Sequence, residues 1–320
     1  MSISEDAAGG GAGSIARPRL EASSPRYGEK LIRALLGLCA LVSVATTLAI
    51  VISLLVPTIG FFGEVPFVDF LFGTDWAPTF ADATFGVLPI VVGTLTVTFW
   101  ALVVAIPVGL LSAIYLAEYA PSRVRRTIKP VLEVLEGVPT VAIGLFALYF
   151  LRPLFEDVLP FLPWSGPFSV GVAGFAVGLM IVPLVASVAD DAMRAVPSGL
   201  RQGAYALGAG KMTVSLRVVL PAAISGVVAA FVLATSRAIG ETMVVLLAAG
   251  ATPQMTFPWQ VTESVQTMTA FIGTTATGDI ATGTITYDTI FAVGALLFVM
   301  TLIMNMFAIR LVRRFREVYE

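Results

Sequence analysis

Six long apolar stretches constrain this chain more than any other feature of its sequence. A helix needs about 20 apolar residues to cross the hydrocarbon of a bilayer. The stretches cover residues 34–56, 86–117, 137–155, 168–189, 221–249 and 286–309. Only 12% of the residues are charged, about half the share typical of soluble domains. The sequence therefore predicts an all-α polytopic membrane protein with six transmembrane helices.

The basic residues gather in alternate loops of such a six-span chain. All lysines and arginines except Arg152 and Arg237 lie in four segments, 17–33, 123–129, 194–217 and 310–316. Because lysine and arginine accumulate on the cytoplasmic side of a membrane protein, both termini are predicted to be cytoplasmic, in the plasma (inner) membrane. Five or seven spans would mix the two sides, which favours six.

The first 28 residues differ from the rest of the chain. They are rich in glycine, serine and proline with scattered charges, a composition that predicts a disordered cytoplasmic tail. The first long apolar run begins only after Arg33 and lacks a persuasive cleavage site, so a secretory signal peptide is not predicted. Residues 29–320 are predicted to form one transmembrane domain, with long outer segments at 57–85 and 250–285.

The composition also argues against catalysis by this chain alone. Histidine is absent, which removes the commonest general base and metal ligand. Cys39 is the single cysteine, so an internal disulfide is excluded. No Gly-x-x-x-x-Gly-Lys-Ser/Thr sequence occurs, so ATP hydrolysis by the chain itself is not expected. We expect no metal, no cofactor and, with a net charge of only -2, no nucleic-acid partner.

The cytoplasmic loop at 190–220 is long for a connection within a bundle. Ser198 is predicted to be the N-cap of a helix. Leu200, Ala204 and Leu207 then fall on one helical face, and Gly208 and Gly210 are predicted to end the helix.

A second short helix would carry Met212, Leu216 and Val219 on one face, and Pro221 would open the fifth span. Such a helix-turn-helix is either a plain connector on the membrane surface or a docking site for a soluble partner.

Arg237 and Glu241 lie near the middle of the predicted fifth span. In a continuous helix this four-residue spacing places them on one face. One charge at the centre of a bilayer costs about 2.5–3.5 kcal/mol on insertion scales. The pair therefore predicts either a salt bridge that fixes helix packing or a polar constriction on a substrate path.

The planar fork of arginine matches oxyanions such as phosphate. Glu241 would hold the Arg237 fork while the path is empty, and Thr235, Ser236 and Thr242 are predicted hydroxyl donors nearby. Phosphate and sulfate are not distinguished by these groups.

The 190–220 loop resembles the coupling motif of ABC importer permeases, Glu-Ala-Ala, three residues, Gly, nine residues, Ile-x-Leu-Pro. The matching positions are Gln202, Gly203, Ala204, Gly208, Val218, Val219, Leu220 and Pro221. The spacing agrees throughout, while Gln202 and Gly203 depart from the usual Glu-Ala. The resemblance implies the type I importer permease fold with a cytoplasmic coupling helix, in which Gln202, Gly203, Ala204, Gly208, Leu220 and Pro221 contact an ATPase.

Residues 237–243, with Ala248-Ala249-Gly250, resemble the signature of phosphate permeases of the PstC and PstA type. Residues 137–141 and 286–305 are similar to PstC-type chains in particular. The resemblance implies phosphate import with Arg237 and Glu241 important for uptake. It also implies a PstA-like second permease, two PstB-like ATP-binding subunits and a PstS-like extracytoplasmic binding protein. A permease for sulfate or molybdate and, further off, a secondary transporter remain alternatives.

Overall fold

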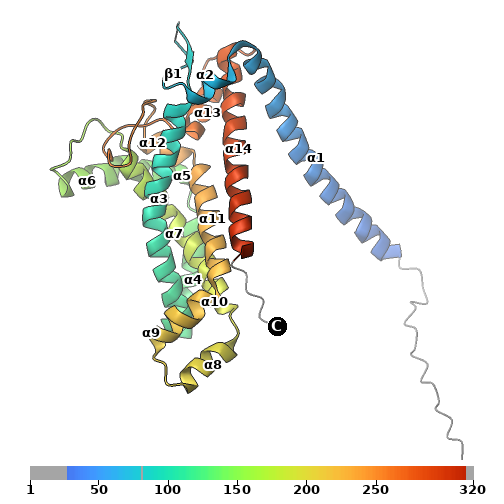
Figure 1. Cartoon of the computed structure of the whole chain (residues 1–320), viewed down its shortest axis with the longest axis vertical. Coiled ribbons are helices and arrows are strands. Elements are labelled where there is room, and N and C mark those ends of the chain that lie inside the picture. Colours follow the sequence, from blue (N-terminus) through green and yellow to red (C-terminus); the bar gives the residue numbers. More distant parts are fainter. Residues whose placement is uncertain (1–26, 81, 315–320) are drawn as a thin grey trace, which may run out of the picture. The chain divides into compact units, whose positions relative to one another are not determined.

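A computed structural model describes residues 27–80 and 82–314, most of them helical (Figure 1). The predicted tail falls outside the described residues apart from its last two positions. By their contacts the described residues form two units, which divide between Val51 and Ile52.

The described part of the first unit is the N-terminal portion of α1 (Tyr27–Glu64). The side chains of residues 29–50 are exposed, although the apolar stretch of α1 has a mean hydropathy of 2.5. A helix that is apolar on all sides needs lipid or another protein around it.

The second unit contains the remaining elements. A short helix, α2 (Phe67–Phe72), precedes a two-stranded antiparallel sheet in which β1 (Trp76–Ala77) pairs with β2 (Thr84–Phe85). The helices that follow are α3 (Leu88–Ile114), α4 (Ser122–Glu136), α5 (Thr140–Phe146), α6 (Arg152–Val158), α7 (Val170–Arg194), α8 (Ser198–Ala206), α9 (Lys211–Val214), α10 (Leu220–Ala222), α11 (Ile224–Ile239), α12 (Met243–Ala248), α13 (Met268–Thr277) and α14 (Ile285–Arg314). Single π-helical turns follow α3, α5 and α9 at Tyr115–Tyr119, Ala147–Leu151 and Ser215–Val219.

Four helices of the described residues are long and apolar enough to cross a membrane, namely Glu29–Glu64, Leu88–Tyr119, Val170–Arg194 and Ile285–Arg310. Two bent pairs bring the number to six if each pair is one span. One pair bends by 89° between Glu136 and Thr140, and the other bends by 72° at Ala223. Pro139, in the first bend, has no N–H to continue the helical hydrogen bonding.

The core of the second unit lies where α7 packs along α3 (Figure 1). Gly174 and Gly178 make this close approach possible. A Cβ atom added at Gly174 would lie 2.5 Å from Cβ of Trp100, and one at Gly178 would lie 2.8 Å from the carbonyl oxygen of Ala101. Small residues allow membrane helices to approach closely in this way.

The predicted fifth span, 221–249, is wrong as one continuous helix. α11 ends at Ile239, and α12 begins only at Met243. Gly240 is the C-cap of α11, and glycine is a poor helix former. The span is also bent at its N-terminal end, because α10 contains Pro221 and α11 starts after the bend.

The start of α8 also differs from the prediction. Pro197 is the N-cap, with φ -55° and ψ 135°. Ser198 is the first helical residue and makes no capping hydrogen bond. The preceding Val196 is buried and its carbonyl accepts a hydrogen bond from Arg201, which fixes where the chain turns into the helix.

Candidate functional site

The break between α11 and α12 is built around Glu241. This side chain is buried, with 5% of its surface exposed. Its Oε1 atom accepts hydrogen bonds from the backbone N–H groups of Met243 at 3.1 Å and Val244 at 3.2 Å. The carbonyl of Glu241 accepts a third bond from Thr269 Oγ1 at 2.7 Å. The carboxylate therefore caps the first turn of α12, where a negative charge is favourable.

Arg237 lies in the last turn of α11 and is exposed. The four-residue spacing predicted that Arg237 and Glu241 share one helical face. This prediction is wrong, because α11 ends at Ile239, between the two residues. Among the described residues, no hydrogen bond or ion pair is formed by the Arg237 side chain. The Glu241 carboxylate was predicted to hold the Arg237 guanidinium. It instead accepts hydrogen bonds from the backbone of α12.

The predicted hydroxyl donors have separate partners. Ser236 Oγ donates to Oδ1 of Asn305 at 2.8 Å, which ties α11 to α14. Thr235 Oγ1 bonds the carbonyl of Phe231 one turn earlier at 2.8 Å. Thr242 Oγ1 lies 3.3 Å from the carbonyl of Gly240. Asn305 was not predicted as part of this site. The sequence could have indicated it, because an amide inside an apolar helix often forms a hydrogen bond to a neighbouring helix.

The capping geometry predicts different outcomes for two replacements of Glu241. Glu241→Gln keeps an oxygen acceptor for both N–H groups, so uptake should fall by less than about tenfold. Glu241→Ala removes the cap, which costs about 1 kcal/mol of helix stability, and should reduce both uptake and thermal stability further. Transport and unfolding of the purified complex measure the two effects. Equal defects in both variants would show that the charge, not the cap, is what matters.

The 190–220 loop forms the predicted helix-turn-helix around a left-handed glycine. Gly208 has φ +81°, a conformation that glycine adopts without strain. The N–H of Gly208 bonds the carbonyl of Tyr205 at 2.9 Å, and the N–H of Ala209 bonds that of Ala204 at 3.1 Å. These bonds close the end of α8.

The loop presents apolar side chains to its surroundings. Leu207, the C-cap of α8, is 90% exposed, Met212 is 68% exposed and Tyr205 is 44% exposed. The predicted common face of Leu200, Ala204 and Leu207 is therefore wrong. Only Ala204 packs against a core cluster, because α8 stops before Leu207.

The residues of the coupling motif divide into two groups. Gln202, Gly203, Gly208 and Pro221 are exposed, and a Cβ added at Gly203 would meet nothing within 4 Å. Ala204 and Leu220 are partly buried against the core cluster that includes Val214 and Val219. One group is thus open to a partner while the other anchors the loop to the helices.

An unpredicted contact fixes α8 to the membrane helices. The Arg201 guanidinium donates from Nε and Nη2 to Glu118 Oε1 at 3.1 and 3.0 Å. It also donates to the carbonyls of Val196 and Met193, both at 2.7 Å. Glu118 is 5% exposed and Arg201 20% exposed. We call this contact the Arg201–Glu118 clamp. It joins α8 to the end of α7 and to the π-turn after α3.

A second ionic contact joins α7 to α4. Asp190 of α7 is fully buried and pairs with Arg125 of α4 at 2.7 Å and with Lys129 at 3.8 Å. Lys129 also pairs with Asp191. Arg125 and Lys129, two of the basic residues on which the predicted cytoplasmic loop rests, are therefore paired with carboxylates near the end of α7.

Comparison with known proteins agrees with this fold and loop. The family described as "Binding-protein-dependent transport system inner membrane component" matches residues 105–317. The chain is 34% identical over 273 residues to the probable ABC transporter permease protein YqgH of Bacillus subtilis, covering 84% of this chain and 86% of that protein. It is 33% identical over 258 residues to phosphate transport system permease protein PstC 1 of Mycobacterium tuberculosis, covering 75% and 76%. The match to PstC of Pasteurella multocida, at 34% identity over 197 residues, covers 57% of this chain and 61% of that protein.

Solved structures agree on the fold. A bacterial alginate ABC transporter aligns with a TM-score of 0.60 at 16% identity, covering 91% of this chain and 98% of that one. The MetNI methionine ABC transporter aligns with a TM-score of 0.53 at 19% identity, covering 72% and 95%. The fold and the coupling loop define a membrane subunit of an ABC importer, and the predicted type I permease fold is confirmed. The chain belongs to the binding-protein-dependent transport system inner membrane component family, and within it is similar to PstC-type permeases.

Proposed function

We propose that this chain is one permease subunit of an ATP-driven importer that moves inorganic phosphate into the cytoplasm by alternating access. Several of its relatives are phosphate transport permeases. The observation that carries the proposal is the exposed guanidinium of Arg237 in the last turn of α11, without a partner among the described residues. An arginine inside a membrane span needs water, an anion or another protein beside it, and its fork suits phosphate.

The proposed complex supplies what this chain lacks. A second, PstA-like permease would cover the α11 surface and close a wet path past Arg237. Two PstB-like ATPases would dock on the coupling loops of the two permeases, and a PstS-like protein would deliver phosphate from outside. The basic loops favour a cytoplasmic position for both termini and the coupling loop. Since family membership makes this an ABC permease, a secondary transporter is no longer an alternative.

A permease for another oxyanion is the second candidate, because an arginine fork also binds sulfate. The test is uptake of labelled phosphate by the reconstituted complex, with sulfate and molybdate as competitors. We expect unlabelled phosphate to compete and the other two to fail at equal concentration. Uptake that sulfate or molybdate suppresses as strongly as phosphate would contradict the assignment of the cargo.

The coupling loop offers a matched pair of glycine variants. Gly208→Val should uncouple ATP hydrolysis from uptake, because a β-branched residue at φ +81° is strained and the turn between α8 and α9 would shift. Gly203→Ala, five residues earlier, has open space around it and should leave coupling intact while stabilising α8 by about 1 kcal/mol.

Uptake and ATP hydrolysis are measured together in proteoliposomes. We expect at least a tenfold rise in ATP used per phosphate for the Gly208 variant, on the order of the 1–3 kcal/mol cost of a strained residue. Full coupling in Gly208→Val would argue against the docking role of the turn.

A further inference from the structure

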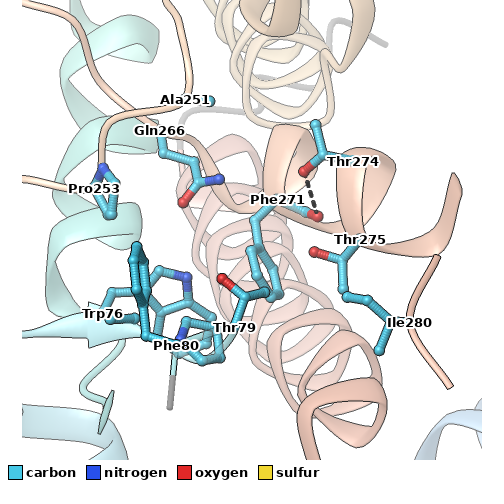
Figure 2. Close-up of a pocket in the computed structure, with 12 residues that line it drawn as sticks. Trp76, Thr79, Phe80, Ala251, Pro253, Gln266, Phe271, Thr274, Thr275 and Ile280 are labelled. Carbon is cyan, nitrogen blue, oxygen red and sulfur yellow. Dashed lines mark hydrogen bonds between the residues drawn. The ribbon is translucent and has the colours of Figure 1, made fainter. Parts of the chain in front are cut away.

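A cavity of about 260 Å³ lies on the second unit between β1, residues 251–266 and α13 (Figure 2). The described residues that line it are all uncharged, and they include the aromatic rings of Trp76, Phe80 and Phe271. Its walls come from the two long segments that the charge pattern places outside the membrane. Neither the coupling loop nor Arg237 contributes to it.

One buried hydrogen-bond donor in this cavity is unsatisfied. Trp76 is 4% exposed, yet its Nε1 atom has no hydrogen-bond partner. The other tryptophans are satisfied. Trp100 and Trp164 donate to the carbonyls of Pro258 and Leu159 at 2.8 and 2.9 Å, and Trp259 is 73% exposed. An indole N–H only donates, so the Trp76 site is complementary to an acceptor.

Two more polar side chains at the cavity are nearly buried. Gln266 is 9% exposed and Thr275 is 6% exposed. Neither the Gln266 amide nor the Thr275 hydroxyl has a hydrogen-bond partner among the described residues. Figure 2 shows the Gln266 amide and the Trp76 indole nitrogen around the same space, with the Thr79 hydroxyl beside them. The cavity thus gathers several groups that can donate a hydrogen bond and no fixed anion to compete for them.

We propose that this cavity is an outer subsite for the transported tetrahedral oxyanion, which Trp76 Nε1, Gln266 and Thr275 bind before it reaches Arg237. The inference rests on the proposed function. Every oxygen of a tetrahedral oxyanion accepts hydrogen bonds, and bonds to an ionised acceptor are stronger than neutral ones. Neutral donors provide specificity without the strong hold of an opposite charge, so the anion can leave again.

The fold connects this subsite to the break that carries Glu241. Phe271 and Thr275 of α13 line the cavity, and Thr269, in the first turn of α13, donates to the Glu241 carbonyl. A Cβ added at Gly273 would contact the Thr242 side chain at 3.4 Å. Occupation of the cavity therefore acts on a helix that already contacts the α11–α12 break.

The test uses the full transport complex in nanodiscs without the binding protein and measures equilibrium binding of labelled inorganic phosphate. Trp76→Phe removes the N–H and keeps a smaller aromatic ring, and Thr275→Val removes the hydroxyl and keeps the shape. Each should weaken phosphate binding about tenfold, the effect of one hydrogen bond to an anion. Trp259→Phe, an exposed tryptophan outside the cavity, should bind phosphate as the wild type does.

Thr275→Val should also unfold at the same temperature as the wild type or a higher one, because it keeps the side-chain shape and removes a nearly buried hydroxyl that has no partner among the described residues. This separates loss of binding from loss of folding. No saturable phosphate binding, or unchanged binding in both cavity variants, would overturn the subsite. Weaker docking of the binding protein with unchanged phosphate binding would also overturn it and assign the cavity to a side chain of that protein.

Uptake by the wild-type complex with its loaded binding protein distinguishes the two proposals. If wild-type uptake of phosphate is normal and the cavity variants bind phosphate normally, only the subsite fails. If the wild-type complex transports no phosphate, the proposed function fails with it.

Discussion

Replacing Arg237 with glutamine should reduce phosphate uptake by at least about 100-fold, while the complex still assembles and binds its ATPases. Two charge-assisted hydrogen bonds from the guanidinium to a phosphate oxyanion contribute about 1.5–3 kcal/mol each, and a loss of 2.8 kcal/mol corresponds to a factor of 100. Arg237 forms no hydrogen bond or ion pair within the described chain and is exposed on α11. Its removal should therefore leave the fold of this subunit unchanged.

Two further variants sharpen this prediction. Arg237→Lys keeps the charge but loses the planar fork, so uptake should be intermediate, reduced by about tenfold. Arg310→Gln serves as a matched control, since Arg310 is also exposed on an apolar helix, at the end of α14, and should transport as the wild type does. Labelled uptake in proteoliposomes, with the amount of assembled complex measured in parallel, provides the comparison. Normal transport by Arg237→Gln would remove Arg237 from the substrate path.

Length and hydropathy were sufficient to predict three of the long apolar helices. The runs near 86–117, 168–189 and 286–309 became the long helices α3, α7 and α14, because a helix must satisfy its own backbone in lipid. The same reasoning could not find the break after Ile239. Residues on both sides of it are apolar, and the interruption depends on tertiary bonds, from Glu241 to α12 and from Thr269 to Glu241.

The turn of the coupling loop was predictable for a different reason. Gly208 occupies a left-handed position that local sequence alone makes probable for glycine. The contact between Arg201 and Glu118 was not predictable, since the two residues are 83 positions apart. Only the packing of α7 against α3 brings them together, and no spacing in the sequence encodes that distance.

Replacing Arg201 with methionine should uncouple ATP hydrolysis from phosphate uptake. The Arg201–Glu118 clamp joins α8, the proposed ATPase contact, to the carbonyls at the end of α7 and to the turn after α3. Methionine keeps much of the packing volume but removes every donor. The ATPase should still bind through exposed Leu207 and hydrolyse ATP, while its movement no longer displaces α3 and α7 as one body.

We expect the ATP used per phosphate to rise at least tenfold in Arg201→Met, because the clamp includes several bonds to a charged group, each contributing about 1.5–3 kcal/mol. Part of any defect would come from Glu118, left buried without its partner. The double variant Arg201→Met, Glu118→Leu removes that unpaired charge, and replacement of a buried ion pair by apolar residues often restores stability.

Thermal unfolding and coupling, measured on both single variants and the double variant, complete a double-mutant cycle. If the clamp transmits motion, the double variant should recover its stability and remain uncoupled, because two flexible apolar side chains make no directional contact with the carbonyls of Met193 and Val196. Recovery of both stability and coupling would mean that the clamp only supports the fold. In that case the transmission of movement would depend on the apolar anchoring of Val214 and Val219.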